Sequence, residues 1–184
     1  GVGEHDMFIA RSGVDGVPSY LSIAFAAYQL RVVGVVPDRE DGATALVLGP
    51  QGDTRYRVEA VHFDRSQTLT QRETVALLDD DGALGGAVMA ADSRGWPVIA
   101  ISGTRIDLDG TIHDGPRALV MRIGQGLRAE SLLDVDALVG VDIADLDVDG
   151  DVIAIGGSYT GQPPGWPAWA TSCGFVAELG VAGG

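Results

Sequence analysis

Four aspartates between positions 145 and 151 have the residue type and spacing of a calcium-binding loop. Asp145, Asp147, Asp149 and Asp151 occupy alternate positions, with a glycine before the last of them. Carboxylate oxygens are ligands that Ca²⁺ prefers, and alternate positions can converge on one ion where the backbone curls around it. The twelfth position of such a loop is Gly156 instead of the bidentate glutamate of an EF-hand. An EF-hand is therefore excluded, and a calcium site of another type is one of two hypotheses for this segment.

The second hypothesis is an ordinary exposed strand. Because side chains alternate between the two faces of a strand, Asp145, Asp147 and Asp149 would share one face. The opposite face would then carry the apolar residues of the segment, which are Ala144, Leu146 and Val148. This interpretation predicts a solvated ladder of carboxylates and needs no metal.

A proline-rich loop at 161–170 contains two tryptophans, Trp166 and Trp169. Tryptophan is enriched at binding hot spots, and loops on a rigid β scaffold commonly carry function. The two rings could therefore offer flat apolar faces to a sugar or to a protein partner. The alternative is that both rings fold back as a lid over the edge of a sheet, since large aromatic side chains are mostly buried.

No other residues are spaced for catalysis. The histidines, His5, His62 and His113, share no metal-ligand spacing, and the one cysteine, Cys173, can form no disulfide within the chain. No serine lies in a G-x-S-x-G elbow, and no glycine pair precedes a helical pattern of the kind that binds phosphate. A glycosidase carboxylate pair is defined by its separation in space, so the sequence alone does not identify an active site.

The charge of the chain excludes two classes of partner. Its 184 residues include 26 acidic and 12 basic ones, which gives a formal net charge of −14. A negative field of this size repels phosphate backbones and anionic lipid surfaces, so we expect no nucleic-acid binding. The longest apolar runs, 21–27 and 98–101, are far shorter than the roughly 20 residues of a membrane-spanning helix, so we expect no membrane insertion.

The elements that would position these residues follow a repeat. One unit reads as a strand, a polar turn, a β-branched strand and a glycine, and its copies lie at 87–104, at 143–158 and, more loosely, at 21–34. A second apolar unit follows each of them, with copies at 43–52, 117–126 and 174–183 and a further copy at 6–16. Short β-branched runs bounded by Gly, Pro and Asp predict strands joined by tight turns. The only short helical candidate is Arg72–Leu78.

Two hairpins per repeat would form a four-stranded antiparallel sheet that is apolar on both faces and must be covered on both. The pattern resembles the β-propeller repeats of bacterial cell-surface proteins (SBBP-like repeats). The resemblance implies an all-β fold of consecutive four-stranded antiparallel blades, about three plus part of a fourth, in a single domain over 1–184. The implied repeats are 1–16, 17–63, 83–133 and 139–184, with an insertion loop at 64–82.

These observations favour a non-catalytic scaffold or interaction module of a bacterial cell-envelope or extracellular assembly. Because propellers have about four to eight blades, we expect the partner to be another protein or the remainder of a larger propeller. One alternative is a glycan-active hydrolase or lyase with its site on the propeller loops. Another is a calcium-dependent carbohydrate-binding module that uses the aspartate segment and the tryptophan loop.

Overall fold

The computed structural model is an all-β protein in which every strand pairing is antiparallel. It describes residues 7–12, 18–23, 31–38, 42–52, 54–66, 68–79, 86–135, 141–150, 152–160 and 172–180. Within these ranges the only helical element is the short 3-10 turn η1 (Gln125–Leu127), so no helix there has the length to cross a membrane. The all-β prediction is confirmed.

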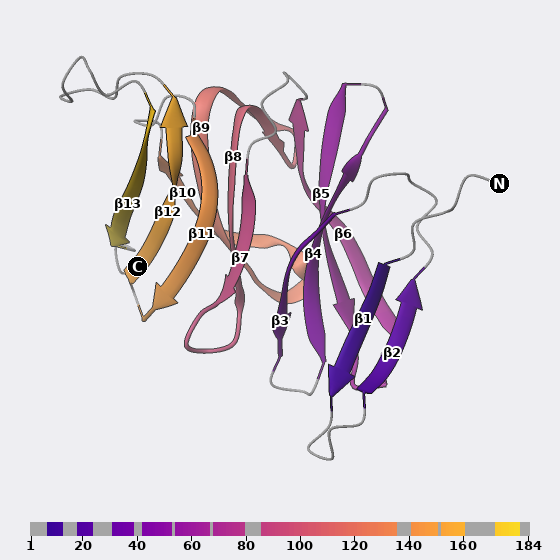
Figure 1. Cartoon of the computed structure of the whole chain (residues 1–184). Coiled ribbons are helices and arrows are strands. Elements are labelled where there is room, and N and C mark those ends of the chain that lie inside the picture. The colour runs from indigo at the N-terminus through magenta and orange to yellow at the C-terminus, as the bar shows by residue number, and fades with distance from the viewer. Residues whose placement is uncertain are drawn as a thin grey trace.

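The described strands form three antiparallel meanders and one separate hairpin (Figure 1). The hairpin consists of β1 (Met7–Ser12) and β2 (Pro18–Ile23). The first meander contains β3 (Arg31–Pro37), β4 (Ala43–Pro50), β5 (Arg55–Phe63) and β6 (Leu69–Asp79). The second contains β7 (Ala87–Ala91), β8 (Pro97–Leu108), β9 (Thr111–Ile123) and β10 (Ala129–Val135). The third contains β11 (Val141–Asp149), β12 (Val152–Thr160) and β13 (Ser172–Gly180).

The second meander lies between the other two and has a hydrophobic core on each face. The side chains of its strand β8 enter the two cores in turn, because successive side chains of a strand point to opposite faces. Ile99 and Ile101 pack into the core shared with the first meander, whereas Val98 and Ala100 pack into the core shared with the third. The uninterrupted apolar run in β8 is therefore explained by burial on both faces. Among the described residues, backbone pairing between the first two meanders joins Leu77 with Asp107 and Leu78 with Ile106.

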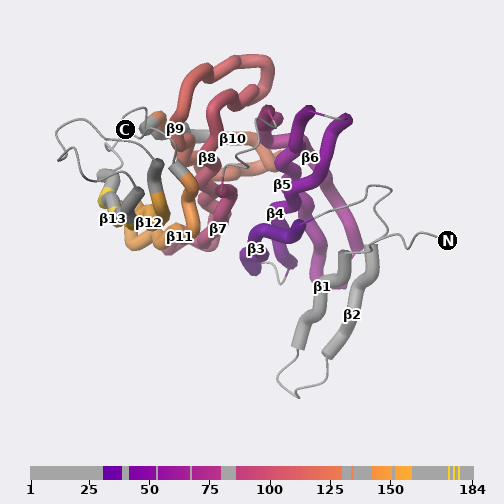
Figure 2. The backbone as a smooth tube through the Cα atoms, turned by 45° about the horizontal axis from the view of Figure 1, so that its top comes forward, coloured from indigo at the N-terminus to yellow at the C-terminus, as the bar shows by residue number. Residues whose placement is uncertain are grey.

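The first strands of the three meanders, β3, β7 and β11, lie side by side at the centre of the molecule (Figure 2). Glycines permit this approach. A Cβ atom added to Gly34 of β3 would lie 2.9 Å from Cβ of Met89 in β7, and one added to Gly86 would collide with the Ile143 carbonyl oxygen in β11. Ser102 reinforces the contact between the second and third meanders. Its hydroxyl donates to the carbonyl of Gly86, directly before β7, and accepts from the N–H of Ile143 in β11.

The structure corrects the sequence interpretation around 64–82. This segment, expected to be an insertion loop with a helical candidate at 72–78, contains strand β6, which pairs with β5 along most of its length. The first half of β6 is polar and exposed, and two bulges interrupt its pairing, so it lacks the alternation that predicts a strand. The copy expected at 21–34 is also divided, because β2 pairs with β1 whereas β3 opens the next meander.

Candidate ligand-binding cleft

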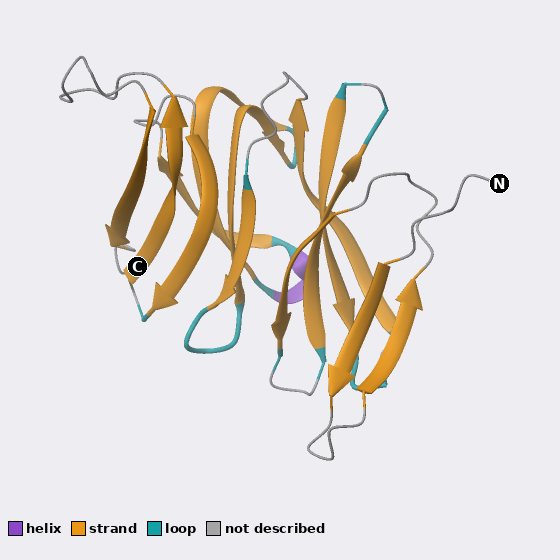
Figure 3. Ribbon diagram, viewed as in Figure 1, coloured by secondary structure: helices purple, strands orange, loops and turns teal. Residues whose placement is uncertain are grey.

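A cleft of about 410 Å³ lies where the turns of the first two meanders meet. The first meander contributes residues from the β3–β4 turn and from the adjoining ends of β4, β5 and β6, and the second contributes the β7–β8 and β9–β10 turns. Figure 3 shows η1, which belongs to the β9–β10 turn, between the two sheets. A volume of this size is within the range of small-molecule sites. The lining residues are Asp38, Thr44, His62, Gln71, Arg94, Gly95, Trp96, Pro97, Ile123, Gly124, Gln125, Gly126 and Leu127.

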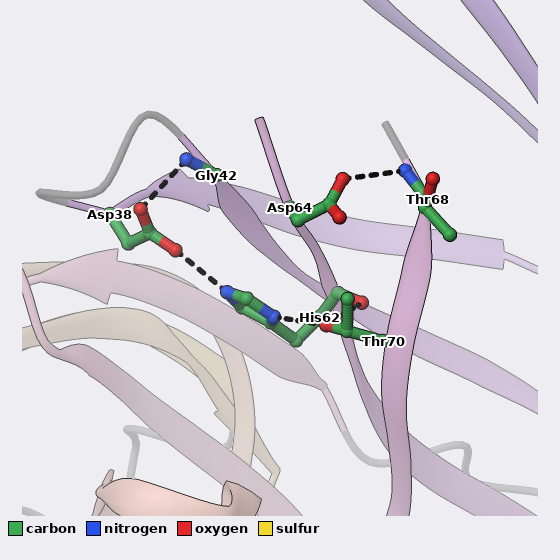
Figure 4. Close-up of polar contacts among 6 residues, drawn as sticks. All are labelled: Asp38, Gly42, His62, Asp64, Thr68 and Thr70. Carbon is green, nitrogen blue, oxygen red and sulfur yellow. Dashed lines mark hydrogen bonds and ion pairs between the residues drawn. The ribbon is translucent and has the colours of Figure 1, made fainter. Parts of the chain in front are cut away.

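One wall of the cleft contains a chain of hydrogen bonds through His62 (Figure 4). Its Nε2 lies 2.7 Å from Oδ2 of Asp38, and its Nδ1 lies 2.6 Å from Oγ1 of Thr70. Thr70 sits at a bulge of β6, between the pairs that Leu69 and Gln71 make with β5. The bulge places an extra side chain beside the imidazole, as bulges do where a strand must re-aim a residue.

Both ring nitrogens of His62 have protein partners whichever protonation state the ring adopts. In the neutral ring, Nε2–H donates to Asp38 and Nδ1 accepts from the Thr70 hydroxyl. In the imidazolium, both nitrogens donate, and the Thr70 hydroxyl can turn to the His62 carbonyl oxygen, 3.3 Å away. The ring is therefore fixed in orientation at the cleft.

These contacts link an acid, an imidazole and a hydroxyl, as in hydrolase triads. Two described amides of the neighbouring turns are already bonded: the Gly42 N–H donates to Asp38 Oδ1 at 2.8 Å, and the Thr68 N–H donates to Asp64 Oδ1 at 2.9 Å (Figure 4). An acyl-transfer site needs N–H donors aimed at the developing oxyanion. These two amides instead fold their turns.

Asp92 fixes the opposite wall. Its Oδ1 accepts the N–H groups of Arg94 and Trp96, both at 2.8 Å, and its backbone N–H donates to the Trp96 carbonyl. Its Oδ2 lies 3.1 Å from Nε of Arg122, an ion pair without hydrogen-bond geometry at that nitrogen. Trp96, which is 36% exposed, is one of the lining residues of the cleft. Its backbone is therefore held on both its N–H and its carbonyl by Asp92.

The β9–β10 turn joins the two walls. Gly126 has a φ of +73°, and a Cβ added there would lie 3.8 Å from Nε2 of Gln71 in β6. Leu127 has a φ of +56°, which is a strained value for a bulky residue. Its side chain is buried in the core shared by the two meanders, and that burial offsets the strain.

No motif in the sequence points to this cleft as a whole, although a local pattern marks two of the turns that form it. Three turns begin with an aspartate whose carboxylate accepts an N–H four residues later, just before the next strand: Asp38 to Gly42, Asp64 to Thr68 and Asp92 to Trp96. Short polar side chains at turn starts commonly bond the backbone in this way. This pattern marks the turns at Asp38 and Asp92, one in each wall of the cleft, but it does not show that the two turns lie close together.

The structure places Asp145, Asp147 and Asp149 on β11, but one of the residues predicted to face the core does not do so. Asp145, Asp147 and Asp149 are exposed and Leu146 is buried, as a strand requires. A bulge between Ile143 and Asp145 shifts the alternation, so that Ala144 is exposed and Ile143 occupies the core instead. The predicted apolar face is thus wrong at Ala144, because an extra residue in one strand moves the following side chains across the sheet.

No metal centre is evident among these aspartates. Asp145 and Asp147 each accept the N–H of the following residue. Within the ranges that the structure describes, no group of three His, Cys, Asp or Glu side chains could hold a metal ion. Asp151 lies outside those ranges, as do Trp166 and Trp169.

The aspartates belong to a surface that we call the outer face, the side of the third meander turned away from the second. Register places its members opposite one another across β11, β12 and β13: Asp145, Asp147, Asp149, Val152, Ala154, Gly156, Val176 and Glu178.

The outer face has the same position within the third meander as one apolar face has within the second. That face of the second meander packs against the third. Val152 and Ala154 match Val98 and Ala100 in a shared Val-Ile-Ala-Ile run. Val98 is 2% exposed, whereas Val152 is 47% exposed.

Carboxylates replace aliphatic side chains on the outer face. Asp147 pairs with Ala154 as Val88 pairs with Ala100, so an aspartate stands where the second meander has a valine. Likewise, Glu178 stands where the second meander has Val120.

No family model, no curated protein and no solved structure matches this chain. The chemistry of the cleft is therefore the basis for inferring a function.

Proposed function

We propose that this protein is a non-catalytic ligand-binding module whose sheets are stacked as blades of a β-propeller and whose ligand occupies the cleft between the first two meanders. The resemblance of the repeats to those of bacterial cell-surface proteins supports an envelope or extracellular setting. In such a setting, the sheets form a scaffold and the turns carry recognition.

The propeller arrangement is supported by the neighbours of the first strands. In a propeller, four-stranded antiparallel blades surround a central channel. Here β3, β7 and β11 lie side by side, and each meander packs a face on the next. The two complete four-stranded meanders have the same strand order, from the central strand outward.

The observation that carries the binding function is the fixed geometry of both walls. Asp38 holds the β3–β4 turn with one oxygen and orients His62 with the other, and Asp92 fixes Trp96. Preorganisation of this kind lowers the entropic cost of binding. An acyl-transfer site also needs N–H donors aimed at the developing oxyanion, whereas the described amides nearest to His62 in the turns, those of Gly42 and Thr68, are bonded to Asp38 and Asp64. Binding is thus better supported than turnover.

Nuclear magnetic resonance would test the proposed site. A panel of neutral sugars, acidic sugars, nucleotides and short peptides is titrated into ¹⁵N-labelled protein, and the indole signal of Trp96 is assigned with a Trp96→Phe variant. We expect at least one probe to shift this indole signal and the side-chain amide of Gln71, with no chemical change in the probe. If no probe moves either signal, or if a probe is consumed, the proposed function is wrong.

Alanine at Trp96 is expected to weaken binding of whichever probe is found by about 30-fold, the typical loss at a tryptophan hot spot of about 2 kcal/mol. Calorimetric titration measures the change. Ile112→Ala is the control, because Ile112 is another exposed large apolar residue, 49% exposed, at the opposite end of β8 and β9, and its loss should leave the affinity unchanged. Equal losses in both variants would contradict the assignment of the cleft.

A further inference from the structure

We infer that the ligand of the cleft is a neutral oligosaccharide. This inference rests on the proposed binding function and names its ligand class. It is carried by three features of the lining: an exposed tryptophan, polar groups of both hydrogen-bonding kinds, and a balance of charge.

Trp96 supplies an apolar surface for a ligand that is otherwise polar. The residue is 36% exposed, and the two N–H groups that Asp92 accepts hold its backbone in place. Burial of the ring against a ligand removes apolar area from water on both partners. The aliphatic C–H face of a pyranose is such a partner, because its hydroxyl groups project from the ring edge and remain available for hydrogen bonds.

The remaining lining residues match a ring of hydroxyl groups. A hydroxyl both donates and accepts. Gln71 offers an amide that does both, Arg94 offers donors only, and the Asp38 carboxylate is an acceptor that also binds His62. Sites that recognise sugars need this mixture, since a buried hydroxyl without a partner weakens binding.

Charge separates a neutral sugar from other polar ligands. The chain as a whole carries a net charge of −14, so its field repels anionic ligands such as uronates, nucleotides and acidic peptides. The lining of the cleft includes one cationic side chain, Arg94, and one carboxylate, Asp38, so it offers no excess charge of either sign to a charged ligand. A neutral polyhydroxylated ligand is repelled neither by the net charge of the chain nor by the charged residues of the cleft.

Calorimetric titration with defined hexasaccharides tests the inference. The neutral probes are cellohexaose, xylohexaose, mannohexaose and chitohexaose, and the comparison probes are hexagalacturonate and an acidic and a basic hexapeptide. We expect at least one neutral probe to bind and all comparison probes to bind more weakly. Excess EDTA should leave the affinity unchanged, because the proposed contacts are made by protein side chains alone.

Single-residue variants test whether the measured binding takes place in the cleft. Gln71→Ala should weaken binding of the neutral probe about fivefold, the loss of one hydrogen bond. Trp96→Phe keeps an aromatic ring and should retain more affinity than Trp96→Ala, and thermal unfolding of each variant reports whether the fold is intact. Ile112→Ala again serves as the control.

The outcomes separate the two proposals. If hexagalacturonate or a peptide binds in a Trp96-dependent manner while every neutral probe fails, the ligand class is wrong and the binding function stands. If neutral sugars bind equally well to Trp96→Ala, the sugar site lies elsewhere and the inference is overturned. If nothing in either panel binds, both proposals fail.

Discussion

Alanine in place of Asp92 is expected to lower the free energy of unfolding by about 3 kcal/mol. The side chain is only 2% exposed, and it satisfies the N–H groups of Arg94 and Trp96. Removing a buried acceptor leaves its donors unsatisfied at about 1–3 kcal/mol each. Arg122 would also lose its ion-pair partner, although its side chain is 29% exposed and can recover part of its hydration. Urea unfolding monitored by tryptophan fluorescence measures the change.

Asp64→Ala is the matched control for this prediction. Asp64 begins a turn of the same form, but its carboxylate accepts one N–H, from Thr68, and the bond is exposed to solvent. Water replaces an exposed hydrogen bond, so we expect a loss of less than about 1 kcal/mol. The two variants remove the same atoms from the same turn type. Equal losses would show that burial of Asp92 does not matter.

The double variant Asp147→Val with Glu178→Val is expected to strengthen self-association by at least about 100-fold. It gives the outer face the residues found at the equivalent positions Val88 and Val120 of the second meander, which lie on the face packed against the third. Burying a valine side chain contributes about 1.5–3 kcal/mol, and two such side chains correspond to at least a 100-fold change. Val176, already 80% exposed, would extend the apolar surface.

Sedimentation velocity over a range of protein concentrations measures this association. The control is Glu73→Val with Asp114→Val, which removes the same charge from exposed residues outside the outer face. If the control associates as strongly as the outer-face variant, the loss of negative charge explains the association. The two valines of the outer face would then contribute no free energy of association of their own. The carboxylates of the outer face act, on this view, as a polar cover that prevents an exposed apolar patch on this meander.

The sequence was sufficient for the all-β class and for the strands with strong apolar character. The Val-Ile-Ala-Ile runs of β8 and β12 predict strands because four apolar residues, three of them β-branched, follow one another, and the structure has strands there. It was insufficient for β6, whose polar first half and bulges conceal the strand, and for Ala144, where a bulge changes the face. A bulge depends on the partner strand, so local periodicity does not report it.

The candidate site was hidden for a different reason. Asp38 and Leu127 are far apart in the sequence, and they line one cleft because three separate turns end at the same place. The histidine at 62 was set aside for lack of ligand spacing, yet its partners come from the β3–β4 turn, in the case of Asp38, and from the bulge of β6, in the case of Thr70. Proximity of this kind depends on the stacking of sheets, which no short motif encodes.

The narrow backbone junction between the first two meanders affects how the protein would respond to mechanical load. Among the described residues, two pairs, Leu77 with Asp107 and Leu78 with Ile106, join these meanders through backbone pairing, and an ion pair between Arg105 and Asp79 and side-chain packing complete the joint. A joint without a continuous hydrogen-bonded ladder resists sliding less than the interior of either meander does, so we expect it to be compliant under tension. A ligand seated in the cleft touches both sheets and would act as a crosslink across that joint, stiffening the protein while it is bound.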